Sequence, residues 1–154
     1  QVIKESMRVY PAVPAIGRAA AQDVEIGGYH VPRGSTVNLF LWVTHRDPRW
    51  WGEDATAFKP ERFAPERQQE IRKYAYLPFA AGPRVCIGNS FAMMEARLLL
   101  ATMLQRWTLA LAPGHTPQPE PLITLRPKGG LRMRAQARTM IGSPQAAPEA
   151  LILS

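Results

Sequence analysis

The stretch FAAGPRVCIG, residues 79–88, contains Cys86, the only cysteine of this 154-residue chain. Gly82 and Gly88 flank the sulfur, Arg84 precedes it by two residues, and a long helical pattern follows directly. Glycines let a backbone approach a flat partner closely, and the start of a helix directs N–H groups and positive partial charge toward a nearby thiolate. The loop therefore favours a thiolate held against a large ligand over a buried structural cysteine.

Other chemistries of cysteine and histidine fit this chain less well. A zinc site needs several closely spaced ligands, whereas the histidines are scattered at His30, His45 and His115. A Cys–His nucleophile stays open in principle, although no local feature marks a histidine as its base. The triplet HRD at 45–47 resembles a kinase catalytic loop, but Gly52 stands where that motif has Asn, and no Gly-rich phosphate loop is present. We expect the histidines to be structural.

Composition and charge restrict the class of protein. The balance of 19 basic against 12 acidic residues gives a net charge of +7, and a run at 126–138 holds basic residues without acids. Such a surface attracts nucleic acid, anionic lipid or acidic proteins, although a solvated basic face is the simplest interpretation. A single cysteine excludes an intramolecular disulfide and fits a reducing compartment, so we expect a cytoplasmic protein, while an N-terminal membrane anchor remains compatible. The chain opens inside a helical pattern without Met, which we interpret as the C-terminal part of a longer protein.

The first half of the chain predicts one helix, small strands and a long irregular segment. The helix should end at Pro11, and a hairpin should turn at Gly27-Gly28 and be followed by a further strand after Gly34. Residues 44–79 are dense in Pro, charge and aromatic side chains and lose any regular period, which is typical of a functional segment.

The second half predicts a long helix and terminal strands. Residues 89–107 have uninterrupted helical spacing, with Asn89 or Ser90 as the expected N-cap. Strands are expected at WTLAL, LITLR and LRMRA, the last two on either side of a turn at 127–130. From about residue 139 the Ala/Pro-rich sequence lacks any period, and we expect a disordered tail over 139–154.

Three motifs together give the chain a family resemblance. ESMR at 5–8, PERF at 60–63 and FAAGPRVCIG at 79–88 resemble, in order and spacing, the Glu-x-x-Arg helix, the second-arginine segment and the cysteine loop of the cytochromes P450. The resemblance covers residues 1 to about 138. It implies the C-terminal, haem-binding portion of the P450 fold, mainly α with small β-sheets and incomplete in this chain.

The resemblance assigns roles to the cysteine loop. It implies haem b as cofactor and Cys86 as the axial ligand of its iron. Phe79 would screen the thiolate from water. Arg84 and Arg18 would bind the haem propionates, because a guanidinium group pairs with a carboxylate through two parallel hydrogen bonds. Gly82 and Gly88 would belong to the same cofactor-binding loop. One departure is Ala80, where the family commonly has Gly, Ser or another small polar residue.

The resemblance also assigns residues outside the loop. Glu5, Arg8 and Arg62 would form a buried charge cluster that serves structure and haem incorporation rather than chemistry. Val13 and Ala15, with the turn at 127–130, would occupy places where the family lines its substrate pocket.

The implied activity is that of a monooxygenase. Such an enzyme inserts one oxygen atom from O2 into a small apolar organic substrate, with electrons from an acidic ferredoxin, flavodoxin or reductase domain. We expect that partner near Arg72, Lys73 and Arg97, and no nucleic acid. Two alternatives are a haem-thiolate isomerase or dehydratase of peroxides and a non-catalytic remnant, and the chain by itself is expected to be inactive.

Overall fold

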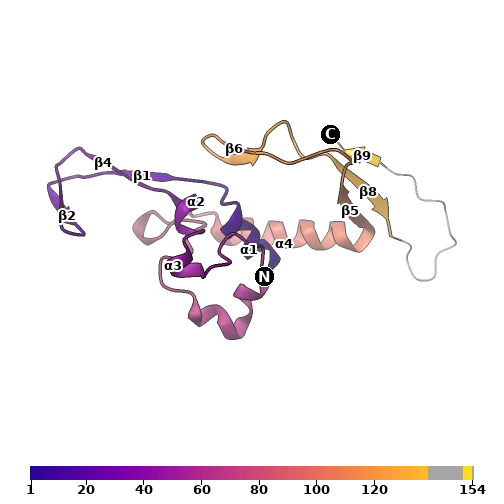
Figure 1. Ribbon diagram of the computed structural model, residues 1–154, viewed down its shortest axis with the longest axis horizontal. Coiled ribbons are helices and arrows are strands. Elements are labelled where there is room, and N and C mark those ends of the chain that lie inside the picture. Colours follow the sequence, from indigo (N-terminus) through magenta and orange to yellow (C-terminus); the bar gives the residue numbers. More distant parts are fainter. Residues whose placement is uncertain (139–150, 154) are drawn as a thin grey trace. The chain divides into compact units, whose positions relative to one another are not determined.

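The computed structural model describes residues 1–138 and 151–153, and these form two compact units. The first unit contains Gln1–Cys86 together with Ile123–Leu125, and the second contains Ile87–Leu122 and the chain from Arg126 onward. Figure 1 shows the elements of each unit. The predicted combination of helices with small sheets is confirmed.

The first unit opens with a helix and two small antiparallel sheets. Helix α1 (Val2–Val9) ends before the buried Pro11, as predicted. The predicted hairpin joins β2 (Val24–Ile26) to β3 (Tyr29–Val31), and its two turn glycines have φ of 58° and 83°, which suits residues without a Cβ. The further strand, β4 (Thr36–Leu39), pairs with β1 (Ile16–Ala19), a strand that the sequence pattern did not predict.

Short helical turns fill the segment predicted to be irregular. Within residues 44–79 they are α3 (Pro48–Trp51), η1 (Pro60–Phe63) and η2 (Pro65–Glu70), while α2 (Leu41–Thr44) ends where the segment begins and η3 (Gly82–Arg84) follows it. Proline opens several of these turns because its missing N–H needs no partner there. The core of the unit lies among them, with Trp51, Ala55, Phe63 and Ala75 buried against Tyr76. Aromatic side chains, rather than regular secondary structure, hold this segment together.

The second unit is built on the long helix α4 (Asn89–Arg106), which matches the prediction within one residue at its C-terminal end. The predicted cap is wrong, because Gly88 occupies the N-cap position and no side chain bonds the free N–H groups. The Ser90 hydroxyl instead donates to the Asn89 side chain at 2.9 Å. Among the described residues, no helix has both the length and the apolar composition needed to cross a membrane.

The remaining strands pair differently from the prediction. Strand β5 (Trp107–Leu111) pairs with β8 (Met133–Ala137), whereas β7 (Leu125–Pro127) pairs with β6 (Pro119–Pro121). LITLR is thus mostly outside any strand, because only its last residues find a partner. The predicted tail lies outside the described residues at 139–150 and 154. Within the predicted tail, the described residues Leu151–Leu153 form β9, which pairs with β8.

Candidate functional site

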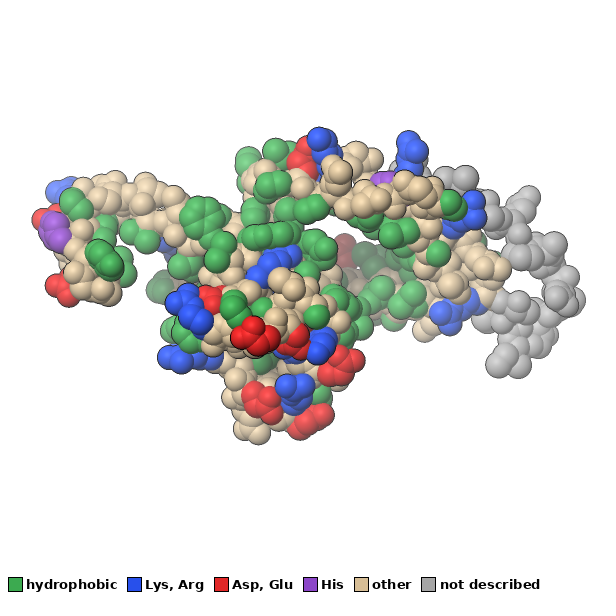
Figure 2. All heavy atoms as spheres, in the orientation of Figure 1, with side chains coloured by type: hydrophobic (Ala, Val, Ile, Leu, Met, Phe, Trp, Pro, Cys, Tyr) green, Lys and Arg blue, Asp and Glu red, His purple; other side chains and the backbone are tan. Residues whose placement is uncertain are grey.

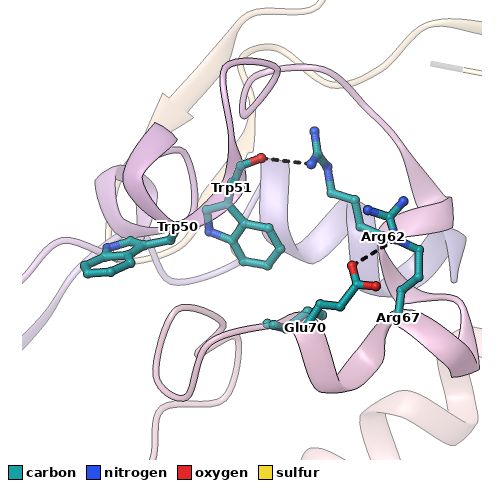
Figure 3. A pocket seen from close by; sticks show the side chains of 6 residues that line it. Trp50, Trp51, Arg62, Arg67 and Glu70 are labelled. Carbon is teal, nitrogen blue, oxygen red and sulfur yellow. Dashed lines mark hydrogen bonds and ion pairs between the residues drawn. The ribbon is translucent and has the colours of Figure 1, made fainter.

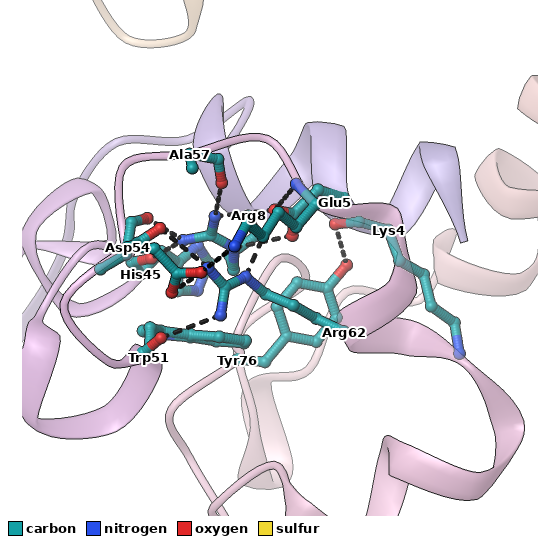
Figure 4. A network of polar contacts seen from close by, with 11 residues as sticks. Lys4, Glu5, Arg8, His45, Trp51, Asp54, Ala57, Arg62 and Tyr76 are labelled. Carbon is teal, nitrogen blue, oxygen red and sulfur yellow. Dashed lines mark hydrogen bonds and ion pairs between the residues drawn. The ribbon is translucent and has the colours of Figure 1, made fainter.

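A buried ion pair joins two residues on one face of α1. Glu5 and Arg8 are both 0% exposed, and their spacing of three places the side chains side by side. The Arg8 Nε donates to Glu5 Oε2 at 2.7 Å, and its Nη2 donates to Glu5 Oε1 at 2.8 Å. Figure 4 shows this pair at the centre of a larger network of polar contacts.

The other N–H groups of Arg8 bind the irregular segment. Its Nη1 donates to the carbonyls of His45 and Ala55, both at 2.6 Å, and its Nη2 donates to the Ala57 carbonyl at 2.9 Å. These contacts and the pair with Glu5 use all five donors of a guanidinium group. One buried side chain therefore fixes three backbone positions far from it in sequence.

Arg62 enters the same network from η1. Its Nη1 donates to the Trp51 carbonyl at 2.9 Å, and its Nη2 donates to the Asp54 carbonyl and carboxylate at 2.8 and 2.6 Å. Its Nε lies 3.7 Å from Glu5 Oε1, which is an ion pair but too long for a hydrogen bond. The structure thus brings together the three residues predicted from the motifs, with Arg62 bound to Glu5 less tightly than Arg8 is.

Asp54 is a member of the cluster that sequence reasoning missed. Its carboxylate accepts hydrogen bonds from Lys59 and Arg62, which lower the pKa of the Asp54 carboxyl below its usual range. No sequence motif around Asp54 predicts this role. Residues 54–62 form no single helix or strand, so no periodicity links Asp54 to Arg62.

His45 is a second missed member, and it is 0% exposed. Its Nε2 accepts the backbone N–H of Leu77 at 2.9 Å, and its ring stacks at 5.6 Å on Tyr76. Burial, together with the nearby cations of Arg8 and Arg46, lowers the pKa of His45 from 6.5 to about 4. The imidazole is therefore neutral near pH 7, as expected of a structural histidine.

A small cavity adjoins the cluster. It measures about 120 Å³ and is lined by Trp50, Trp51, Arg62, Arg67, Glu70 and Ile71. Figure 3 shows Arg67 bonded to Glu70 across it, and Arg62 bonded to the Trp51 carbonyl. Sites for drug-sized ligands measure roughly 300–1,000 Å³, so this cavity is too small for a cofactor.

The cysteine loop folds back on itself between Phe79 and Cys86. Ala80 and Gly82 take φ of 60° and 72°, and the Cys86 N–H donates to the Phe79 carbonyl at 2.9 Å. Ala80 N–H also donates to the Leu77 carbonyl at 3.1 Å. The cysteine is free and exposed, and a Cβ built on Gly82 would meet nothing within 4 Å.

Arg84 and Phe79 flank the sulfur within this loop. Arg84 is exposed, and among the residues that the structure describes it makes no side-chain hydrogen bond or ion pair. Phe79 is partly buried, and Gly88 stands at the N-cap of α4. An exposed thiol, an unengaged guanidinium group and open space at a glycine are what a flat, anionic cofactor needs from a loop.

The other predicted site residues lie in the bend after α1 and in β1. Arg18 is exposed on β1 and donates to the Gly17 carbonyl at 2.7 Å. Val13 and Ala15 are partly exposed in the bend, where the Leu125 N–H donates to the Ala12 carbonyl at 2.7 Å. The sequence did not predict this contact with Leu125.

Comparison with known proteins identifies the family. The family described as Cytochrome P450 matches residues 1–133. The chain belongs to the cytochrome P450 family. Cytochrome P450 714A2 of Arabidopsis thaliana is 38% identical over 135 residues, and cytochrome P450 4V2 of Mus musculus is 47% identical over 106 residues.

The chain matches a part of these P450 relatives. It covers 26% of the Arabidopsis protein and 20% of the mouse protein, while the alignments include 86% and 69% of the chain. The crystal structure of a cytochrome P450 (CYP102L1) is 36% identical with a TM-score of 0.79, over 88% of this chain and 30% of that one. The predicted partial P450 fold is confirmed, and membership of the P450 family implies a haem cofactor.

Proposed function

We propose that this chain is the haem-binding C-terminal part of a monooxygenase, with Cys86 as the axial ligand of haem b iron. The observation that carries the proposal is the position of Cys86, in a loop folded back by positive φ at Ala80 and Gly82 and two residues before the N-cap of α4. The residues present fit the cofactor, since the loop offers one soft anionic ligand and leaves space beside it. When bound, the haem would supply the oxygen chemistry that no side chain of this chain can perform.

The loop residues bind and screen the cofactor. The Cys86 thiolate would hold the iron, and the bond from its N–H to the Phe79 carbonyl fixes the turn that presents it. Phe79 would exclude water from the sulfur side, and the exposed Arg84 would pair with a propionate. Arg18 is the second propionate partner in this proposal, after release of its local bond to Gly17.

The proposed reaction places one atom of O2 in a small apolar organic substrate and releases the other as water. Two electrons and two protons complete the balance, and the electrons come from a separate redox protein. Val13 and Ala15 would contact the substrate from the bend after α1. A peroxide isomerase or dehydratase would need no external electrons, so dependence on a reductant separates that alternative from the monooxygenase.

An acidic partner fits the surface around Arg72 and Lys73. Both side chains are exposed, and a cavity of about 250 Å³ beside them is lined by Lys4, Arg72 and Lys73 and by no carboxylate. Figure 2 shows acidic side chains interspersed with basic ones on this unit's visible face. A short cluster of basic residues suits an acidic protein more than a long polyanion. We propose the cytoplasm as the compartment.

The ligand assignment is tested in the full-length protein. The reduced carbon monoxide complex should absorb at the position typical of a thiolate ligand, and Cys86→Ser should abolish that band. Val85→Ala, a change at an exposed neighbour in the same loop, is the matched control and should keep the band. A thiolate-type spectrum that survives in Cys86→Ser would refute the assignment.

A further inference from the structure

His45 places a polar ring in the interior of the first unit, where burying a polar group is costly unless it forms a hydrogen bond. The side chain is fully buried, and among the described residues its Nδ1 has no hydrogen-bond partner. An apolar side chain of similar volume would fill this space without that desolvation. What the imidazole adds is an acceptor, Nε2, for the backbone N–H of Leu77.

Leu77 lies in a segment with no other source of an acceptor. Residues 75–81 form neither helix nor strand, so no ladder satisfies their backbone groups, and Leu77 is 9% exposed. A buried backbone N–H without a partner is costly. The bond to His45 satisfies this N–H, and together with the Tyr76 hydroxyl, which donates to the Lys4 carbonyl at 2.9 Å, it holds the segment in place.

The same bond connects the charge cluster to the cysteine loop. The His45 carbonyl accepts from Arg8 at 2.6 Å, and its ring accepts from Leu77 at 2.9 Å. The Leu77 carbonyl accepts from Ala80, and the Phe79 carbonyl accepts from Cys86. His45 thus connects the buried ion pair, through two hydrogen bonds of its own, to the segment that leads into the turn before the sulfur.

We propose that His45 is a positioning residue for the cysteine loop: its neutral Nε2 holds Leu77 and thereby transmits the rigidity of the Glu5–Arg8 pair to Cys86. This inference rests on the proposed function for the role of Cys86, whereas the hydrogen bond itself does not. His45 touches neither substrate nor cofactor in this arrangement. Its effect is on the geometry and solvent exclusion of the ligand.

Three substitutions in the full-length protein separate an acceptor from a space filler. His45→Phe keeps a flat ring against Tyr76 and removes the acceptor. His45→Gln places an amide oxygen near the position of Nε2, and His45→Asn, one methylene shorter, places it near Nδ1. His30→Phe, at an exposed histidine of β3, is the control.

The first measurement is amide hydrogen exchange at Leu77. Loss of the acceptor should accelerate exchange about tenfold or more in His45→Phe and His45→Asn. His45→Gln and His30→Phe should exchange at the wild-type rate. Wild-type exchange rates at Leu77 in all three variants would overturn the proposal. If His45→Phe does not fold, equal exchange rates at Leu77 in His45→Gln and His45→Asn would overturn it by themselves.

The second measurement is the reduced carbon monoxide spectrum of the same proteins. The Phe and Asn variants should lose part of the thiolate-type band in favour of the band of a displaced or protonated sulfur, and Gln should restore it. Faster exchange at Leu77 with an unchanged band and an unchanged iron midpoint potential would overturn the positioning role. Failure of the proposed function is seen separately, as a thiolate-type band that survives Cys86→Ser.

Discussion

Replacing Arg8 by lysine tests how much the five-donor arrangement contributes to stability. The guanidinium is fully buried and donates twice to Glu5 and once each to the carbonyls of His45, Ala55 and Ala57. Lysine keeps the charge but has three N–H donors, so at least two buried acceptors lose their partner. Each such loss costs about 1–3 kcal/mol, and breaking a buried pair costs about 3–5 kcal/mol, so we expect Arg8→Lys to lower the free energy of unfolding by about 3–5 kcal/mol.

The assay is urea unfolding of the full-length protein, followed by fluorescence of the buried Trp51. Arg49→Lys is the matched control, because Arg49 also pairs with a carboxylate, Asp47, yet its side chain is 76% exposed. Exposed pairs contribute little to stability, so the control should leave the free energy of unfolding nearly unchanged. Equal effects of the two substitutions would refute the reasoning.

A double-mutant cycle with Glu5→Gln isolates the pair. Once Arg8 is lysine, the geometry of the paired hydrogen bonds is already lost, so the second substitution should cost much less than it does alone. Additive effects within about 0.5 kcal/mol would show that Glu5 and Arg8 act independently, contrary to their contacts.

Three further outcomes are expected. Ala80→Gly should raise the free energy of unfolding by up to about 1 kcal/mol, because Ala80 has φ of 60° and glycine adopts that conformation without strain; a clear loss in urea unfolding would contradict this. The pKa of His45 is 6.5 in the unfolded state and about 4 in the folded state, so the unfolded state binds a proton first as pH falls. The free energy of unfolding should therefore be at its full value above pH 6.5 and fall by about 3 kcal/mol as pH drops to 4. His45→Gln should lack this pH dependence. Charge reversal at Arg72 and Lys73 should slow electron transfer at low salt and flatten its dependence on ionic strength, while reversal at Lys128 should not; tight, salt-sensitive binding of duplex DNA with unchanged electron transfer would favour a nucleic-acid surface instead.

The sequence predicts the parts of this site that have a local period or a fixed motif. Glu5 and Arg8 are three apart on a helix, so their pairing follows from helix geometry. Arg62 needed the family resemblance, because no local rule brings residue 62 to residue 5. His45 and Asp54 escaped prediction since their partners, Leu77 and Arg62, are chosen by the path of an irregular chain.

The strands show the same division between local and distant pairing. The hairpin of β2 and β3 follows from Gly27-Gly28, a local turn signal. Strand β1 pairs with β4 across that hairpin, and β8 pairs with β5 rather than with β7, the strand that precedes it in sequence. Such distant registers depend on which edges remain free after the local turns have formed, and the sequence pattern of a short strand does not contain that information.

The two units differ in how deeply their side chains are buried. Helix α4 has no buried residue among those described, and Phe91 and Leu98 are 65% and 62% exposed on it. A helix that is apolar on many sides is typical of the interior of a larger core. Glu5, Arg8 and His45, in contrast, are fully buried, and among the described residues their side-chain hydrogen-bond partners belong to the first unit. An ion pair is stabilising in a dry site only when its remaining donors and acceptors are satisfied, and here Arg8 satisfies all of its donors within that unit. Within residues 1–86, hydrogen bonds therefore lead from Arg8 through His45 and Leu77 to the turn that precedes Cys86.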